Sequence, residues 1–191
     1  MKKYLLVFVL FLSPYLITAQ GESFQINEET PELINQYVVI KKDSMNVEDG
    51  YNKILEWIKI TYNTPKEVIK AELENEYIRI EGASDAITSK KMLGMSISFR
   101  GKYSITFEFK ENKVKMELTR LQVYSPPSQY SSGGWSDSYP NYASQTKKNG
   151  KPKKSMVYWN NGYVKSINEL MISIQDYVNN PDKSIIKKDD W

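Results

Sequence analysis

The chain has 191 residues, of which 26 are lysine or arginine and 23 are aspartate or glutamate, and it contains neither histidine nor cysteine. Without imidazole and thiol groups, catalysis by Ser-His-Asp or Cys-His arrangements, metal sites with nitrogen or sulfur ligands, and disulfide bonds are all excluded. The sequence therefore predicts no catalytic motif, no metal site and no cofactor, and one hydrophobic core must hold the fold.

The N-terminus has the order of a secretory signal peptide. Two lysines precede an apolar run from Tyr4 to Leu12, and Ala19 supplies the small residue of a cleavage site. The run is about half as long as the roughly 20 residues that a membrane-spanning helix requires. We therefore expect residues 1–19 to be removed and the mature protein to be exported, to the periplasm or outside the cell. A retained single-span anchor is the alternative.

Removal of this segment changes the charge. Without Lys2 and Lys3 the chain has 24 basic residues against 23 acidic ones, so the net charge falls from +3 to +1. A nearly neutral protein has no overall field that attracts nucleic acid. Because no cysteine follows the apolar run, a lipoprotein anchor is excluded, and we expect no transmembrane segment in the mature chain.

The mature chain begins with a polar segment and then becomes periodic. Residues 20–35 are mostly polar and acidic and predict a loosely ordered leader. A short buried strand is predicted at 37–40, followed by a helix within 44–62 that Ser44 or Asn46 can cap. The apolar face of this helix consists of Val47, Tyr51, Ile54, Leu55, Ile58 and Tyr62.

From residue 68 onward the apolar period changes to two, which predicts strands. In the clearest of them, Tyr103, Ile105 and Phe107 alternate with Ser104 and Thr106, so one face of the sheet is expected to pack and the other to face water. The predicted strands are 68–73, 77–81, 95–99, 103–109 and 114–123, joined by a loop at 82–91 and turns at 100–102 and 111–112.

Residues 125–154 are rich in serine, glycine, proline and lysine, and they predict a loop or insertion that is either functional or disordered. Residues 155–181 are expected to complete the domain. Their predicted parts are a short strand at 156–159, a turn at 160–162 and a helix that starts with capping-box spacing at 166–169. A charged tail, 182–191, follows.

The order of these elements predicts an α+β fold. The core, residues 36–124, together with 155–181, is expected to form a curved antiparallel sheet with two helices packed on one face, in the order β-α-β(4-5)-α.

Several segments of the core resemble the domain of unknown function 4468 family. The similar segments are Tyr51 to Ile58, Tyr62 to Ile69, Ile78 to Gly82 and Tyr103 to Lys113. The resemblance covers roughly Val38 to Tyr124. It implies a TBP-like fold and an exported protein of the Bacteroidota, a phylum whose exported proteins show a similar Ala-Gln junction to Ala19-Gln20. The family carries no catalytic residues to transfer, and the resemblance says nothing of the residues after Tyr124.

A TBP-like fold does not by itself indicate DNA binding. TATA-box recognition needs phosphate-neutralising arginines and apolar wedges on the sheet. Arg79, Arg100 and Arg120 are the only three arginines of this chain. We therefore expect no nucleic-acid partner. The fold itself does not argue for one, since fold is a weak guide to function.

The aromatic residues of the 125–154 segment are the candidate contact residues. Tyr130, Trp135, Tyr139 and Tyr142 lie among serines, glycines and asparagines, a composition similar to that of an antibody paratope. Such rings suit stacking on sugars or gripping a protein surface. The alternative is an insertion whose aromatic residues merely lie on the domain.

Carboxylates offer the remaining route to catalysis. Glu108 and Glu117 could form an acid/base pair of glycosidase type, or they could form ordinary cross-strand ion pairs with Lys113, Lys115 or Arg100. Ser84 lacks the strand-to-helix context of a nucleophile and is interpreted as a loop serine.

These features predict a non-enzymatic exported binding or structural module of the cell envelope. Its partner is unknown, with an envelope protein or a glycan as the candidates, and its contact surface is expected on the exposed sheet face or the aromatic loop. The alternative is a carboxylate-based glycan-processing enzyme or a hydrolase-associated domain. An exposed aromatic patch favours the first, and a cleft with converging carboxylates favours the second.

Overall fold

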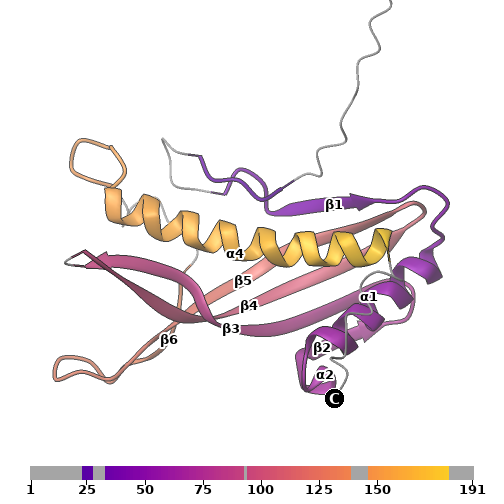
Figure 1. The fold of residues 1–191 in the computed structure, drawn as a ribbon, viewed down its shortest axis with the longest axis horizontal. Coiled ribbons are helices and arrows are strands. Elements are labelled where there is room, and N and C mark those ends of the chain that lie inside the picture. Colours follow the sequence, from indigo (N-terminus) through magenta and orange to yellow (C-terminus); the bar gives the residue numbers. More distant parts are fainter. Residues whose placement is uncertain (1–22, 28–32, 93, 139–145, 181–191) are drawn as a thin grey trace, which may run out of the picture.

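The computed structural model describes residues 23–27, 33–92, 94–138 and 146–180 (Figure 1). The predicted signal peptide and the charged tail lie outside the described residues. The described elements are β1 (Tyr37–Lys41), α1 (Val47–Thr61), α2 (Pro65–Val68), β2 (Ile69–Leu73), β3 (Tyr77–Met92), β4 (Met95–Lys110), β5 (Lys113–Ser125), β6 (Gly134–Asp137) and α4 (Lys154–Asn179).

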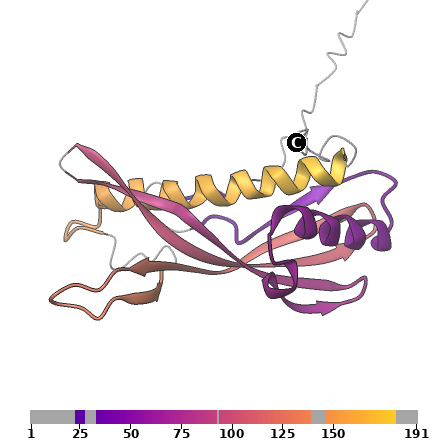
Figure 2. The same cartoon turned by 60° about the horizontal axis from the view of Figure 1, so that its bottom comes forward.

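The strands form one antiparallel sheet in the order β1-β5-β4-β3-β2, and β6 pairs with the C-terminal end of β5. Figure 2 shows the strong twist of this sheet, with α1 and α4 on the same side of it. Helix α4 contacts β3 and α1, and α1 contacts β4 and β5. The predicted α+β class, with a curved antiparallel sheet covered on one face by two helices, is confirmed.

Helix α1 forms as the sequence predicts. The side chain of Asn46 accepts a hydrogen bond of 2.7 Å from the backbone N–H of Asp49, which is the N-cap interaction. The buried side of the helix faces the sheet and α4, and the Nε1–H of Trp57 donates to Ser173 Oγ at 3.1 Å. The two helices are therefore joined by a buried indole that keeps its polar group satisfied.

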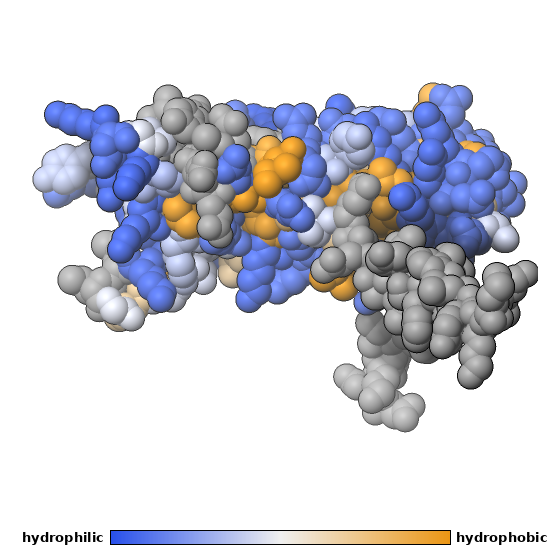
Figure 3. Space-filling model, turned by 90° about the horizontal axis from the view of Figure 1, so that it is seen from above, coloured by the Kyte–Doolittle hydropathy of each residue, from blue (hydrophilic) through white to orange (hydrophobic). Residues whose placement is uncertain are grey.

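One outer face of the molecule is mostly polar. Figure 3, seen from above, shows hydrophilic residues over most of that face and apolar residues in small separate groups. No helix in the described part of the chain is both long and apolar enough to cross a membrane.

Helix α4 begins twelve residues before the predicted capping box, and the predicted strand at 156–159 and turn at 160–162 are wrong. Trp159 packs edge-on against Phe99 at 4.7 Å between ring centroids and against Tyr163 at 5.6 Å. This packing outweighs the turn tendency of Asn160, Asn161 and Gly162, because local propensity is a weak preference. Ser166, in mid-helix, donates its hydroxyl to the carbonyl of Ile87 at 2.9 Å instead of capping.

Gly162 is required where α4 approaches β3. A Cβ at this position would lie 2.5 Å from Thr88 Oγ1, whereas a Cβ on Gly50 in α1 would meet its nearest neighbour at 3.4 Å. Thr88 is held in place because its hydroxyl donates to the carbonyl of Trp159 at 2.6 Å.

We predict that Gly162→Ala destabilises the protein and that Gly50→Ala, the matched control, stabilises it. Alanine gains up to about 1 kcal/mol over glycine in a helix. At Gly162, overpacking of about 1–3 kcal/mol opposes that gain, so a net loss of up to about 2 kcal/mol is expected. Urea unfolding measures both values, and equal stabilisation by the two variants would contradict the close approach.

Strands β3 and β4 are each 16 residues long, so the predicted loop at 82–91 and turn at 100–102 are wrong, and Ser84 lies in a strand. The register of β3 shifts between Ser84 and Thr88, and within this irregularity Ile87 is buried against Gly101. Gly101 therefore allows a close side-chain approach within a strand and does not form a turn.

Part of the predicted leader is packed, which corrects the prediction of loose order for residues 23–27 and 33–35. Phe24 is buried, and its backbone N–H and carbonyl are both hydrogen-bonded to the side-chain amide of Asn168 in α4, each at 2.9 Å. Asn35 joins the two parts of the segment: it accepts from the N–H of Gln25 at 3.0 Å and donates to the carbonyl of Ser23 at 3.0 Å. The segment is thus held by α4.

Several tyrosines are buried in the core with hydrogen-bonded hydroxyls. Burial, with a hydrogen bond to Glu72, raises the pKa of Tyr51 to about 12. The hydroxyls of Tyr62 and Tyr103 lie 2.8 Å apart, and burial raises the pKa of both. The folded protein therefore holds these protons to higher pH than the unfolded chain does.

We predict that stability falls as the pH rises above 10. A raised pKa contributes stability that is fully present below the unfolded value of about 10 and is lost as the pH rises through the folded value. Urea unfolding at pH 8, 10, 11 and 12 measures this decline in stability. The decline should be smaller in Tyr51→Phe than in the wild type. In the control Tyr130→Phe, whose ring is exposed, it should equal that of the wild type. Identical profiles for Tyr51→Phe and the wild type would contradict the assignment.

Candidate binding surface on the outer sheet face

The outer sheet face is the side of the sheet opposite α1 and α4. In β4, Tyr103, Ile105 and Phe107 are buried on the helix side, so Lys102 and Ser104 lie on the outer face. Strand β5 changes its alternation at a bulge. Ser104 pairs with Arg120 while Ile105 pairs with Leu118, which leaves Thr119 as the extra residue, and its hydroxyl donates to the carbonyl of Ser104 at 3.1 Å.

The bulge places a new set of side chains on the outer face. Beyond it, Leu121 and Val123 are buried, so Arg120, Gln122 and Tyr124 point outward. The sheet thus gains an aromatic and charged surface at the end where β6 pairs with β5.

Trp135 on β6 lies directly opposite Tyr124 on β5, with 5.4 Å between the ring centroids. Two cations flank these rings: Lys102 Nζ is 4.6 Å from the centroid of Trp135, and the Arg100 guanidinium is 6.0 Å from that of Tyr124. We call Arg100, Lys102, Tyr124 and Trp135 the aromatic cluster. Such cation–π contacts hold side chains in place while leaving their hydrogen-bonding groups open.

Three ion pairs involve or border the aromatic cluster, one of them between Lys102 Nζ and Glu81 Oε1 at 4.0 Å. Arg120 Nε lies 2.9 Å from Asp137 Oδ1, and Arg100 Nε lies 3.1 Å from Asp85 Oδ1. The hydrogen bond from Arg120 lowers the pKa of Asp137 below its ordinary value. Exposed pairs of this kind contribute little to stability. They do present fixed donors and acceptors beside the rings.

The sequence-predicted contact residues fall in different places. Trp135 lies in a strand, is 38% exposed and belongs to the aromatic cluster. Tyr130 is 89% exposed at the tip of a hairpin closed by backbone hydrogen bonds between Ser128 and Ser131, and no ring contact joins it to the described aromatic residues. Tyr139 and Tyr142 lie outside the described residues. Of the two that the structure describes, Trp135 lies beside other rings and Tyr130 does not; the role of all four as contact residues stays a prediction.

Tyr124, Lys102 and Arg100 are the residues that the sequence interpretation missed. Because residues 100–102 are predicted to form a turn, the sequence interpretation assigns Arg100 and Lys102 to no face of the sheet. Continuing the alternation of β4 backwards through Gly101 would have placed Arg100 and Lys102 on the same face as Ser104.

Glu108 and Glu117 both form ion pairs with Lys115, Glu108 from the neighbouring strand β4 and Glu117 from the same strand β5. Lys115 Nζ lies 3.2 Å from Glu108 Oε1 and 2.7 Å from Glu117 Oε2. Hydrogen bonds to the two carboxylates raise the pKa of Lys115. The two glutamates thus form ion pairs, as one of the two sequence interpretations predicted, and Lys115 is their shared partner. Among the described residues, no three carboxylate side chains gather where they could hold a metal ion.

Comparisons with known proteins identify the fold. Residues 37–124 match the family described as a domain of unknown function (DUF4468) with TBP-like fold. Among solved structures, a DUF4468 family protein from Bacteroides ovatus is similar with a TM-score of 0.58 and 15% identity, covering 82% of this chain and 94% of that one. A TBP-like protein from Parabacteroides distasonis is similar with a TM-score of 0.56 and 13% identity, covering 82% and 97%.

The family match confirms the predicted family, and the two solved structures confirm the predicted TBP-like fold. At 15% and 13% identity the solved structures establish the fold alone. None of the curated proteins matches the chain.

Proposed function

Residues 37–124 are a domain of the DUF4468 family with its TBP-like fold, and because that family name assigns no activity, we propose a function from the outer sheet face. The protein is an exported, non-enzymatic module that binds glycan chains of the cell envelope or its surroundings. The aromatic cluster is its contact surface. The observation that carries this proposal is the pair of rings, Trp135 beside Tyr124, presented on a rigid strand pair.

A glycan suits this surface because sugars combine apolar C–H faces with many hydroxyls. An exposed indole offers a flat apolar face for the sugar ring, and tyrosine adds a polar tip. The bordering pairs Arg120–Asp137 and Arg100–Asp85 supply both donors and acceptors for hydroxyls with no net charge. The position of Trp135 on a strand supports the proposal further, since sites on regular elements are held more firmly than sites on loops.

The ion pairs of the two best candidate carboxylates favour the binding interpretation over the enzymatic one. Glu108 and Glu117 share the ammonium group of Lys115 on an open sheet face. The rings, in contrast, form an aromatic patch in which Trp135 is 38% exposed and Tyr124 is half-buried, and aromatic patches of this kind mark contact surfaces. Export itself is proposed from the signal-peptide order of residues 1–19.

Retention on immobilised glycans tests the proposal. The purified protein is passed over peptidoglycan, mannan and amylopectin, and retained protein and released sugars are both measured. Saturable retention on at least one glycan, with no release of sugars, is expected. Failure to bind any of them would contradict the glycan proposal, and release of sugars would favour the alternative of a glycan-processing enzyme.

A further inference from the structure

Three lysines lie side by side across three neighbouring strands on the outer face. Lys41 on β1 is paired in register with Lys113 on β5, and Lys113 is paired in register with Lys110 on β4. We call these residues the lysine row. All three are exposed, and within the described residues none of them forms an ion pair. Like charges placed directly opposite each other destabilise a sheet, so folding alone does not explain the row.

The lysine row borders a depression of about 540 Å³ on the outer face. Its other lining residues are Tyr37, Val39, Glu108 and Lys115. Glu108 is the one carboxylate in the lining, and it is already engaged by Lys115, as is Glu117. No free carboxylate therefore remains among the lining residues to neutralise the positive charge of the lysine row.

The lining also contains apolar surface. The ring of Tyr37 is half exposed and lies 5.1 Å from Lys115 Nζ, and Val39 sits between Tyr37 and Lys41 on the same strand face. The depression thus offers apolar contact next to a fixed line of ammonium groups. Its volume is within the range of small-molecule sites, about 300–1,000 Å³.

We infer that the lysine row and its depression form a second binding site, which takes a small phosphorylated ligand such as a sugar phosphate. Lysine ammonium groups are compact charges that bind the oxygens of a phosphate as point charges. Neighbouring Cβ positions in the row are about 5 Å apart and the outer two about 10 Å apart, a span that long lysine side chains can close around one phosphate or diphosphate. Tyr37 and Val39 contact the rest of the ligand.

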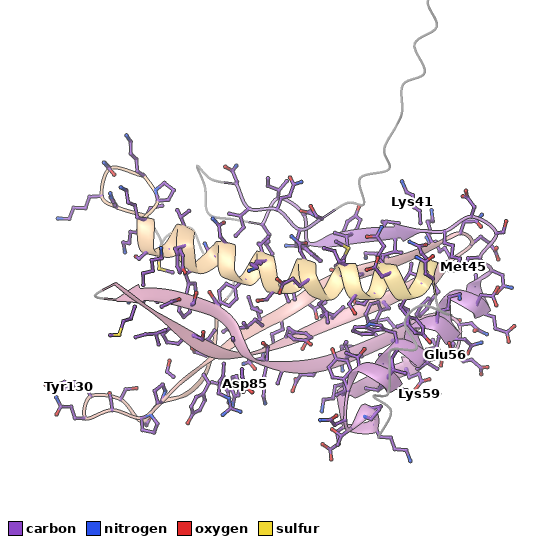
Figure 4. All side chains as sticks on the ribbon, in the orientation of Figure 1. Lys41, Met45, Glu56, Lys59, Asp85 and Tyr130 are labelled. Carbon is purple, nitrogen blue, oxygen red and sulfur yellow. The ribbon has the colours of Figure 1, made fainter. Side chains whose placement is uncertain are left out.

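This site is separate from the aromatic cluster. Figure 4 places Lys41 at the opposite end of the molecule from Tyr130, which lies at the tip of the hairpin that leads into β6. Along β5, Lys113 and Gln122 are nine residues apart, which is about 30 Å at about 3.3 Å per residue. The inference therefore does not rest on the proposed glycan function, and either can fail alone.

Calorimetric titration of the purified protein at low salt tests the site with three probes: pyrophosphate, glucose 1-phosphate and vesicles containing phosphatidylglycerol. We expect saturable binding of the two soluble probes. The triple variant Lys41→Gln, Lys110→Gln, Lys113→Gln should bind them at least tenfold more weakly. The control Lys59→Gln, Lys66→Gln, Lys90→Gln makes the same change in net charge at other exposed lysines and should bind as the wild type does.

Three outcomes would overturn the inference: no binding of either soluble probe, binding of vesicles only, or equal weakening in the two triple variants. A second measurement needs no ligand. Removal of the like charges should raise the melting temperature of the lysine-row variant above that of the wild type, most at low salt. A lower melting temperature would contradict the claim that the row is uncompensated.

Discussion

Phe24→Ala is expected to lower the free energy of unfolding by about 3–5 kcal/mol, the usual effect of removing a buried phenylalanine ring. The residue lies outside the part of the chain that matches the family, 37–124, and within a segment whose composition predicts a loose leader. Its ring is nevertheless only 1% exposed, because it packs between the middle of β5 and helix α4. The surrounding side chains are Leu33, Leu118, Leu121, Tyr163, Val164 and Ile167.

Ile34→Ala is the matched control, since Ile34 belongs to the same segment and is 62% exposed. It should change stability by no more than about 0.5 kcal/mol. Urea unfolding of the wild type and the two variants measures the difference. If Phe24→Ala lost less than about 1 kcal/mol, well below the usual range, the segment would not be part of the core.

Trp135→Ala is expected to weaken glycan binding at least tenfold, a loss of about 1.4 kcal/mol or more. The indole supplies the largest flat surface of the aromatic cluster, and its removal also takes away the support of Tyr124 and Lys102. Calorimetric titration with the glycan that retains the wild type measures the loss. Because Trp135 is on a short edge strand, the variant should keep the melting temperature of the wild type within a few degrees.

Tyr158→Ala is a closely matched control for this variant. Tyr158 is 37% exposed, against 38% for Trp135, and it also has a lysine near its ring, with Lys91 Nζ 5.3 Å from the centroid. It lies on α4, away from the outer face. Equal affinities for wild type and Trp135→Ala, or equal losses in both variants, would exclude the aromatic cluster as the binding surface.

The sequence predicts those parts of the fold in which local pattern and tertiary packing agree. Helix α1 has a capping side chain, an apolar face and a proline after its end, and all three indicate the same element. In β4, the alternation from Tyr103 to Phe109 matches the observed burial except at Thr106, which was predicted to face water and is buried. Each of these elements buries one side against the same core, so its period is visible in the sequence.

The errors arise where tertiary contacts override a local signal. Glycine at 101 and the Asn-Asn-Gly sequence at 160–162 are typical of turns, yet the first admits Ile87 and the second lies in a helix that packs on β3. The burial of Phe24 depends on Asn168, which is 144 residues away in the chain. No window of sequence contains both partners.

The candidate surface could be predicted only in part for a related reason. Trp135 is apparent from the composition of the segment around it. Its neighbour Tyr124 faces outward only because Thr119 forms a bulge, which shifts the alternation of β5 by one residue. An unbroken alternation from Val114 and Met116 would place Tyr124 on the helix side. The lysine row likewise requires the register of three strands, and β1 is far from β4 and β5 in the chain.

Chemical-shift mapping by NMR tests the central claim most directly, because it locates the ligand on the folded protein without any substitution. The labelled protein is titrated with the glycan that retains it. The largest changes are predicted at the indole N–H of Trp135 and at the backbone amides of Lys102, Gln122 and Asp137, which surround the rings. Changes concentrated on α1 or α4, with the Trp135 indole unmoved, would contradict the account.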